Sequence, residues 1–242
     1  MLAAAISDPH AVILRWLRLA GILALCMMGI AFFFILRREI SAKPQAAGAM
    51  LSFILILAQL AFVQTAFRKM QRIMSAAAFV CALFTGVTLL HQSLSPRAIE
   101  MSMLPLDVAC VFAAAVAGFS LMDMLLGHAY LNAAEMTMSP FIRLNLALAI
   151  AMICRAIISV AGTLIVQTVR PTEMFWNLFG LYIGTRWLVG FIVPGIFVYM
   201  AHDCIKRRAT QSATGILYVA GVLIFIGEII GLYLMSETGL PL

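Results

Sequence analysis

Three ionisable residues lie inside long apolar segments of the C-terminal third of the chain: Arg155, Arg186 and Glu228. A charged side chain at the centre of a bilayer costs about 2.5–3.5 kcal/mol on insertion scales, so it is retained where a partner or a function offsets that cost. A carboxylate can bind a guanidinium through short, charge-assisted hydrogen bonds. Two arginines against one glutamate leave a positive group for another acceptor, such as a quinone carbonyl or an anion.

Counting residues along the segments places these groups at one depth. At about 1.5 Å of rise per residue, Arg155, Arg186 and Glu228 lie about 21–24 Å from the predicted cytoplasmic ends, slightly toward the outer face. His91 lies at about 27 Å by the same count, and Tyr233 is at or just outside this level. We therefore predict a polar layer, joined by His91, that binds a quinone or handles protons. A buried ion pair that only fixes helix packing is the alternative.

A second pair of polar residues, Asp123 and His128, lies nearer the cytoplasmic side of the fourth apolar segment. The two are five residues apart, about 140° around a helix, so they do not share a face. A proton path that uses both needs waters or other side chains between them. For His128, and equally for His91, an interfacial position with the ring tip in water is an open alternative.

The elements that position these residues are predicted to be membrane helices. The chain is 64% hydrophobic and 11% charged, with a mean hydropathy of +1.07. Soluble domains are about 45–50% apolar and about 25% charged. A core of this size cannot hide the excess, so the lipid bilayer must be the solvent for most of the chain. The fold class is therefore an all-α integral membrane protein.

Seven stretches reach the length of about 20 apolar residues that a membrane-spanning helix needs. The first is expected to remain as a span rather than to be cleaved as a signal peptide. Short connections make sequential helices antiparallel neighbours, which predicts a single helical bundle domain over residues 1–242. In chain order the predicted spans are 12–36, 46–67, 73–92, 104–131, 141–169, 174–201 and 211–235.

Lysines and arginines in the connections predict the orientation. One set of segment ends carries more of them, including the run Lys206–Arg208, than the other set, which includes Arg37 and Arg38. Because the richer side is usually cytoplasmic, the N-terminus is predicted inside and the C-terminus outside. The net charge of +6 comes from residues at the segment ends, so it indicates lipid headgroup contacts rather than a nucleic-acid partner.

The histidines and cysteines do not predict a haem or metal site. The five cysteines show no CxxC spacing, which disfavours zinc or iron–sulfur ligation by this chain. Two histidines that ligate one haem must face each other at one depth. His91 and His128 lie toward opposite faces, whereas His10 and His202 lie at the cytoplasmic border. We expect no haem or metal to be held by this chain.

Small residues recur in the last two segments, where they predict close approach of the helices. Pro194 is expected to kink the sixth segment near Arg186 and to open room for a ligand. The glycines concerned are Gly180, Gly184, Gly190 and Gly195 in the sixth segment and Gly227 and Gly231 in the seventh.

These two segments resemble the end of the membrane-anchor subunits of dimethyl sulfoxide reductase and polysulfide reductase. The resemblance rests on Arg186–Trp187 and on the run Gly227–Glu228–Ile229–Ile230–Gly231, followed by Tyr233. It implies a haem-free subunit that binds quinol near the outer face and passes electrons to an iron–sulfur partner. The chain departs from that family in having seven predicted helices rather than eight or more, and in carrying Leu232 where a basic residue often follows.

Together these patterns predict a subunit of a bacterial respiratory oxidoreductase in the inner membrane, which is not catalytic alone. It would bind menaquinone or ubiquinone and exchange electrons with an iron–sulfur or other redox subunit. Glu228 and His91 would handle protons or bind the ring oxygens, while Arg155 and Arg186 would tune the site. Two alternatives stay open: a small transporter whose Arg/Glu layer binds a substrate at mid-membrane, and a structural or accessory subunit whose polar layer only locks the bundle.

Overall fold

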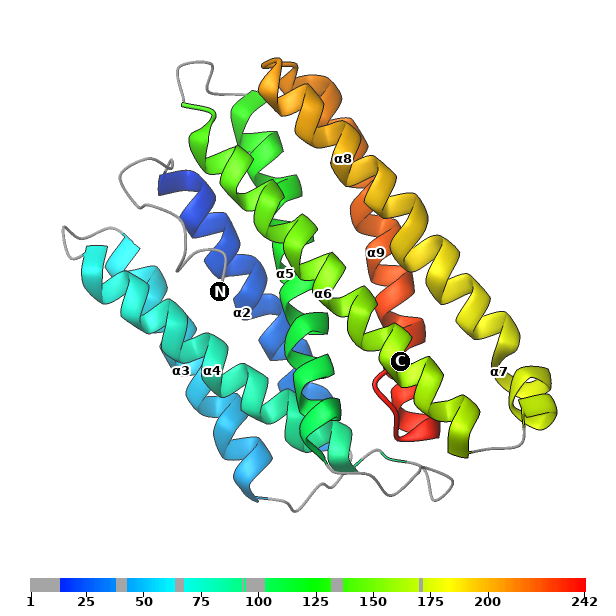
Figure 1. Cartoon of the computed structure of the whole chain (residues 1–242). Helices are drawn as coiled ribbons and strands as arrows, with labels where there is room; N and C mark the ends of the chain where they lie inside the picture. The colour runs from blue at the N-terminus through cyan, green and yellow to red at the C-terminus, as the bar shows by residue number, and fades with distance from the viewer. Residues whose placement is uncertain are drawn as a thin grey trace. The chain divides into compact units, whose positions relative to one another are not determined.

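The computed structural model describes residues 14–37, 43–63, 68–92, 94, 103–131, 137–169 and 172–242. Throughout these residues the regular structure is helical, as Figure 1 shows. The elements are α2 (Leu14–Arg37), α3 (Lys43–Val63), α4 (Arg68–Gln92), α5 (Met103–Leu131), α6 (Ser139–Val169), α7 (Thr172–Trp187), η1 (Leu188–Ile192), α8 (Val193–Lys206) and α9 (Thr210–Thr238).

The prediction of an all-α membrane protein is confirmed. Six of the described helices are long and apolar enough to cross a membrane, with α7, η1 and α8 counted as one span. The second predicted span corresponds to a shorter apolar stretch, Ala47–Phe62, and its predicted residues 64–67 lie outside the described residues. The orientation across the membrane stays a prediction.

The chain divides into two compact units. The first comprises residues 1–89 and 129–140, and the second comprises residues 90–128 and 141–242. The prediction of one bundle domain over the whole chain stays a prediction. Each predicted site residue belongs to the second unit.

In the first unit, glycines allow the helices to approach closely. A Cβ on Gly21 would meet Oε1 of Gln59 at 2.9 Å and would also collide with the side chain of Leu60, so α2 lies directly against α3. A Cβ on Gly48 would meet Oγ1 of Thr85 at 2.6 Å, which places α3 against α4 in the same way.

In the second unit, the helix that carries Arg186 changes its winding ahead of Pro194. The backbone N–H of Val193 bonds to the carbonyl of Leu188, five residues earlier, and this defines the π-helical turn η1. Proline has no N–H to donate and its ring crowds the carbonyl four residues before it. A π-turn is one way to absorb that conflict, and such turns often lie at functional sites. The disturbance predicted at Pro194 is thus a π-turn.

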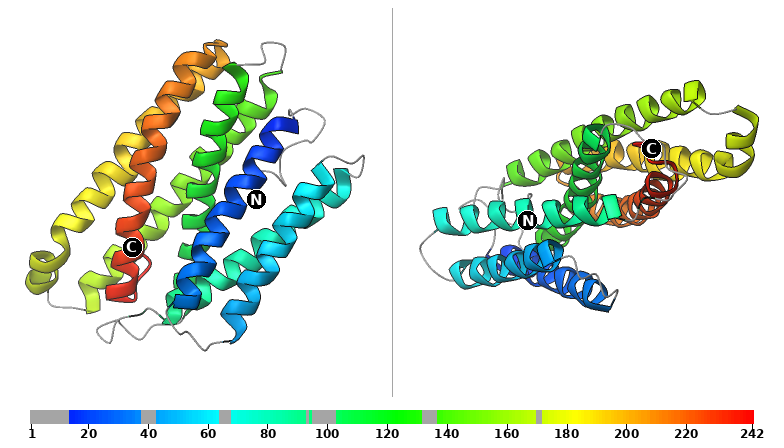
Figure 2. Two further views of the ribbon diagram at one scale, coloured as in Figure 1. Left: turned by 180° about the vertical axis from the view of Figure 1, so that it is seen from behind. Right: turned by 90° about the horizontal axis from the view of Figure 1, so that it is seen from below.

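Beyond Pro194 the chain continues as α8, reverses at Arg207–Ala209 and returns as α9, which packs along α8 (Figure 2). Arg208 adopts a positive φ of 58° in this turn. α9 ends at Gly239, which has a φ of 72° and whose N–H bonds to the carbonyl of Met235. A left-handed glycine is a common helix terminator because it has no Cβ to clash with the backbone.

Candidate functional site

The structure brings the three predicted charges into one cluster, which we call the Arg–Glu cluster (Arg155, Arg186 and Glu228). Nη2 of Arg186 donates to Oε1 of Glu228 at 2.9 Å. Nε of Arg155 donates to the other carboxylate oxygen at 3.4 Å. The side chains of the two arginines are 0% and 1% exposed, and that of Glu228 is 6% exposed. The predicted contact between Arg186 and Glu228 is therefore confirmed, and Arg155 joins it from α6.

Three glycines make room for the guanidinium of Arg186. A Cβ on Gly231 would lie 2.9 Å from its Cζ, and Cβ atoms on Gly227 and Gly190 would lie 3.3 and 3.4 Å from its Nη1. The ring of Phe191 covers the group at 4.3 Å from Cζ, in cation–π contact. The guanidinium is thus packed tightly between α9 and the π-turn.

Close approach of the sixth and seventh segments was predicted from their glycines, and it is confirmed for only part of the set. The backbones meet at Gly190 and Gly227, where a Cβ on Gly190 would lie 2.9 Å from Cα of Gly227. The prediction was wrong for Gly184 and Gly195, because no described atom outside the local helix lies within 4 Å of a Cβ built there. A Cβ on Gly180 would meet only Trp176 of the same helix.

Arg155 has two further contacts besides Glu228. Its Nη2 donates to the main-chain oxygen of Leu242 at 2.7 Å and lies 3.4 Å from Sδ of Met235. Among the described atoms, Nη1 of Arg155 and both Nε and Nη1 of Arg186 have no hydrogen-bond partner. Two cations therefore share one carboxylate, and the cluster keeps the excess of positive charge that the sequence indicated.

His91 bonds to a residue that the sequence analysis did not single out. Its Nε2 lies 2.7 Å from Oδ1 of Asp107, and the two side chains are 28% and 36% exposed. Within the described ranges no hydrogen bond joins His91 to the Arg–Glu cluster. The half-exposed pair fits the interfacial alternative for His91 better than a direct place in the predicted layer.

Tyr233 faces away from the charges. Its ring packs against that of Tyr182, with centroids 5.3 Å apart, and both rings are more than 40% exposed. The pair joins α7 to α9 at the lipid-facing surface. A role for Tyr233 in ligand binding stays a prediction.

Asp123 and His128 lie in different surroundings, as their spacing predicted: Asp123 is fully buried and His128 is exposed. Oδ2 of Asp123 accepts a hydrogen bond from Nδ2 of Asn145 at 2.9 Å. Oδ1 of Asn145 lies 3.1 Å from Nδ1 of His202. A chain of hydrogen bonds thus joins α5, α6 and α8, and we call it the Asp–Asn–His chain (Asp123, Asn145 and His202). A proton path that includes His128 stays a prediction.

The Asp–Asn–His chain ends at a cavity of about 390 Å³ between α6 and the segment η1–α8. Asn145 and His202 line it at one end and Phe191 lines it at the other, about 16 Å away along the helix at 1.5 Å per residue. Its other walls are apolar apart from the hydroxyl of Tyr199. They are Leu146, Ala149, Met152, Ile153, Ala156, Gly195, Val198 and Tyr199. Ile153 and Tyr199 are also largely exposed, so the cavity opens sideways toward lipid.

The cavity and the Arg–Glu cluster share a wall. Phe191 lines the cavity with one part of its surface and covers the guanidinium of Arg186 with its ring. Trp187 packs on the same ring at a centroid distance of 5.2 Å. A ligand in the cavity would therefore lie beside the cluster without touching its carboxylate.

Chemically, the cavity offers apolar walls with one polar end. Oδ2 of Asp123 accepts from Nδ2 of the Asn145 amide, which turns the amide oxygen toward His202. His202 then carries its proton on Nδ1, and its Nε2 becomes an acceptor for a ligand hydroxyl. Within the residues that the structure describes, no group of three or more His, Cys, Asp or Glu is placed to hold a metal ion.

The chain matches no protein-family model, no curated protein and no solved structure. The resemblance of the last two helices to quinol-interacting membrane anchors therefore stays a prediction.

Proposed function

We propose that this membrane protein binds a quinone or quinol in the cavity between α6 and α8, as a haem-free subunit beside a partner that carries the redox centre. The observation that carries the proposal is the polar end of the cavity. There the Asp–Asn–His chain presents His202 to an otherwise apolar space that opens toward lipid. A quinone has the matching chemistry: an apolar ring and isoprenoid tail with two oxygens that accept or donate hydrogen bonds.

Each member of the chain has a separate task in this proposal. Nε2 of His202 accepts a hydrogen bond from a quinol hydroxyl, or donates one to a quinone carbonyl when the imidazole is protonated. Asn145 holds His202 in the tautomer that permits this. The buried Asp123 fixes the orientation of the Asn145 amide. Electrons pass to or from a partner subunit of the same membrane complex.

The location differs from the one expected from the sequence. The polar end of the cavity lies near Lys206–Arg208, on the side predicted to be cytoplasmic, whereas quinol binding was expected near the outer face around Glu228. Phe191 closes the opposite end, and its ring covers Arg186 of the Arg–Glu cluster. Direct binding of quinone by Glu228, Arg155, His91 or Tyr233 stays a separate prediction.

Replacing His202 with Ala should weaken quinone binding about tenfold, because the loss of one hydrogen bond to a buried polar group costs about 1–1.5 kcal/mol. Trp187 lies against Phe191, so a quinone in the cavity should quench its fluorescence. The measurement is a titration of the purified protein in detergent with decylubiquinone, and separately with a short-chain menaquinone, while tryptophan emission is followed.

The matched control is His128→Ala, which removes an exposed histidine of the same unit and should leave the affinity unchanged. Asn145→Leu should weaken binding as His202→Ala does, since it frees the imidazole from its tautomer. Affinities that are equal in all three variants and the parent, or quenching that never saturates, would remove the basis for the proposed site.

A structural or accessory subunit is a second candidate, and one observation favours it. The guanidinium of Arg186 is packed against three glycines and Phe191, so the Arg–Glu cluster has the density of a core rather than of an open site. In that case the cluster only fixes α6, α7 and α9 in register. The Glu228 substitutions described in the Discussion separate this role from a direct role in quinol oxidation.

A further inference from the structure

The segment after α9 folds back into the second unit and packs beside Arg155. Gly239 turns the chain with its positive φ of 72°. The N–H of Leu240 then donates to Oγ1 of Thr238 at 3.2 Å, and the N–H of Leu242 donates to the carbonyl of Leu240 at 2.8 Å. We propose that residues 239–242 are a strap that closes one end of the space between α6, α7 and α9, and keeps water from the Arg–Glu cluster.

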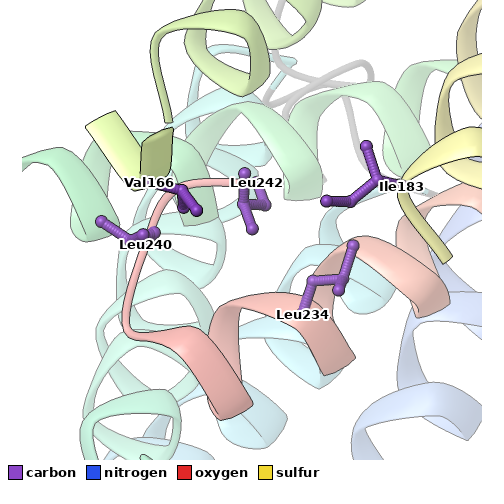
Figure 3. Packing of buried hydrophobic residues seen from close by; sticks show 5 residues of the cluster. All are labelled: Val166, Ile183, Leu234, Leu240 and Leu242. Atoms are coloured by element: carbon purple, nitrogen blue, oxygen red, sulfur yellow. The ribbon is translucent and has the colours of Figure 1, made fainter. Parts of the chain in front are cut away.

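Leucines anchor this strap. Leu240 and Leu242 are 0% and 1% exposed, and they pack with Val166 of α6, Ile183 of α7 and Leu234 of α9. Figure 3 shows these five side chains gathered where the segment passes between the helices. A short segment with two fully buried leucines holds its position through apolar contacts with three different helices.

The surface beneath the strap is shaped to receive its backbone. Gly162 of α6 has no side chain, and a Cβ there would lie 2.7 Å from the carbonyl oxygen of Pro241 and 3.0 Å from its carbonyl carbon. The main chain of Pro241 cannot shift as readily as a flexible side chain could, so this close contact requires glycine at position 162. Gly162 lies on the same buried face of α6 as Arg155 and Ser159, because the three are spaced by four and three residues.

The strap also completes the hydrogen bonding of Arg155. Its Leu242 main-chain oxygen accepts from Nη2 at 2.7 Å, which is shorter than the 3.4 Å from Nε to Glu228. With the strap closed, the charges of the cluster are closely packed and shielded from water. With the strap open, Arg155 loses this acceptor and faces water, so the same charges become an accessible cationic site. The strap thus sets which of the two states the cluster adopts, independently of quinone binding in the cavity.

Cysteine labelling at position 159 tests the strap, because Ser159 is 1% exposed and lies between Arg155 and Gly162 on α6. Ser159→Cys would be treated with a membrane-impermeant sulfonated maleimide, and labelling at this position would be followed by peptide mass spectrometry, which separates it from the native cysteines. Adding Gly162→Leu, which displaces Pro241, should speed labelling at least about tenfold through local opening. Leu240→Asp should do the same, because a carboxylate cannot remain among the leucines.

Gly184→Leu is the matched control, since this glycine of α7 has no described atom within 4 Å of its Cβ position outside the local helix. It should leave the labelling rate unchanged. Leu240→Ala serves in place of Leu240→Asp if the charged variant does not elute as a single species. Rapid labelling in Ser159→Cys alone, equal acceleration by Gly184→Leu, or no acceleration by either strap variant would each overturn the proposal.

Discussion

Replacing Glu228 with Gln should lower the free energy of unfolding by about 3–5 kcal/mol, the cost of removing one partner from a buried ion pair. The carboxylate accepts hydrogen bonds from both arginines, whose side chains are 0% and 1% exposed. Gln keeps the shape of Glu but not its charge, so the two buried guanidinium groups lose the carboxylate that they share. For a chain of this length the loss corresponds to a fall in melting temperature of roughly 6–20 °C, measured in detergent.

The control is Arg207→Ala, which breaks the exposed pair between Arg207 and Asp203 on α8. Its side chains are 75% and 53% exposed, and exposed pairs contribute about 1 kcal/mol or less. The informative partner variant replaces Arg155, Arg186 and Glu228 together with Met, Met and Leu. Replacing a buried ionic group with apolar residues of similar volume is often neutral or stabilising, so this triple variant should recover most of the loss.

The triple variant also decides what the Arg–Glu cluster does. If the proposed quinone function holds and the cluster only locks the bundle, the triple variant assayed in membranes should retain quinol oxidation along with its stability. If the cluster handles protons or tunes a bound quinone, stability should return while turnover stays low. If Glu228→Gln had the same melting temperature as the parent protein, the arginines would have to be solvated. That result would contradict the buried ion pairs of the cluster.

The main features of the fold could be predicted because the bilayer restricts the options. Long apolar runs become helices, and residue depth follows from 1.5 Å of rise per residue. The same count placed Arg155, Arg186 and Glu228 in one layer, and the contacts bear this out. Depth alone predicts the contacts of a charged residue, because a charge in hydrocarbon needs a partner at the same depth.

Neutral and border residues escaped this logic. Asn145 carries no charge, so nothing in an apolar run marks it as a site residue. His202 was predicted to lie at the cytoplasmic border. In the structure Asn145 bonds to both Asp123 and His202. Asp107 was read as part of an apolar span, although it is the partner of His91. A single polar side chain gives no direction around a helix axis until the neighbouring helices are known.

The π-turn explains why only some of the glycines were read correctly. Every residue after Leu188 is rotated relative to an uninterrupted α-helix, because the turn bonds five residues back instead of four. A face counted from Gly180 and Gly184 therefore does not continue through Gly190. The fold-back of residues 239–242 was missed for a different reason: four residues are too few to show a period.

Replacing Gly227 with Ala should lower stability by about 1–3 kcal/mol, the usual cost of overpacking a filled interior. The added methyl group would collide with the backbone of Gly190, which the π-turn holds in place. Helix propensity works in the opposite direction, because Ala is favoured over Gly by about 1 kcal/mol within a helix. A net loss therefore requires that the collision outweigh this gain, and the measurement is again the melting temperature in detergent.

A graded series makes the reason for the loss testable. In Gly231→Ala the new methyl group would meet the guanidinium of Arg186, with Cζ 2.9 Å away, and a side-chain terminus can shift more readily than backbone. In Gly184→Ala no described atom outside the local helix lies within 4 Å of the new Cβ, so only the propensity gain of up to about 1 kcal/mol remains. The expected order of stability is Gly184→Ala above Gly231→Ala above Gly227→Ala. Equal melting temperatures across the series would mean that α9 and the π-turn are not in backbone contact.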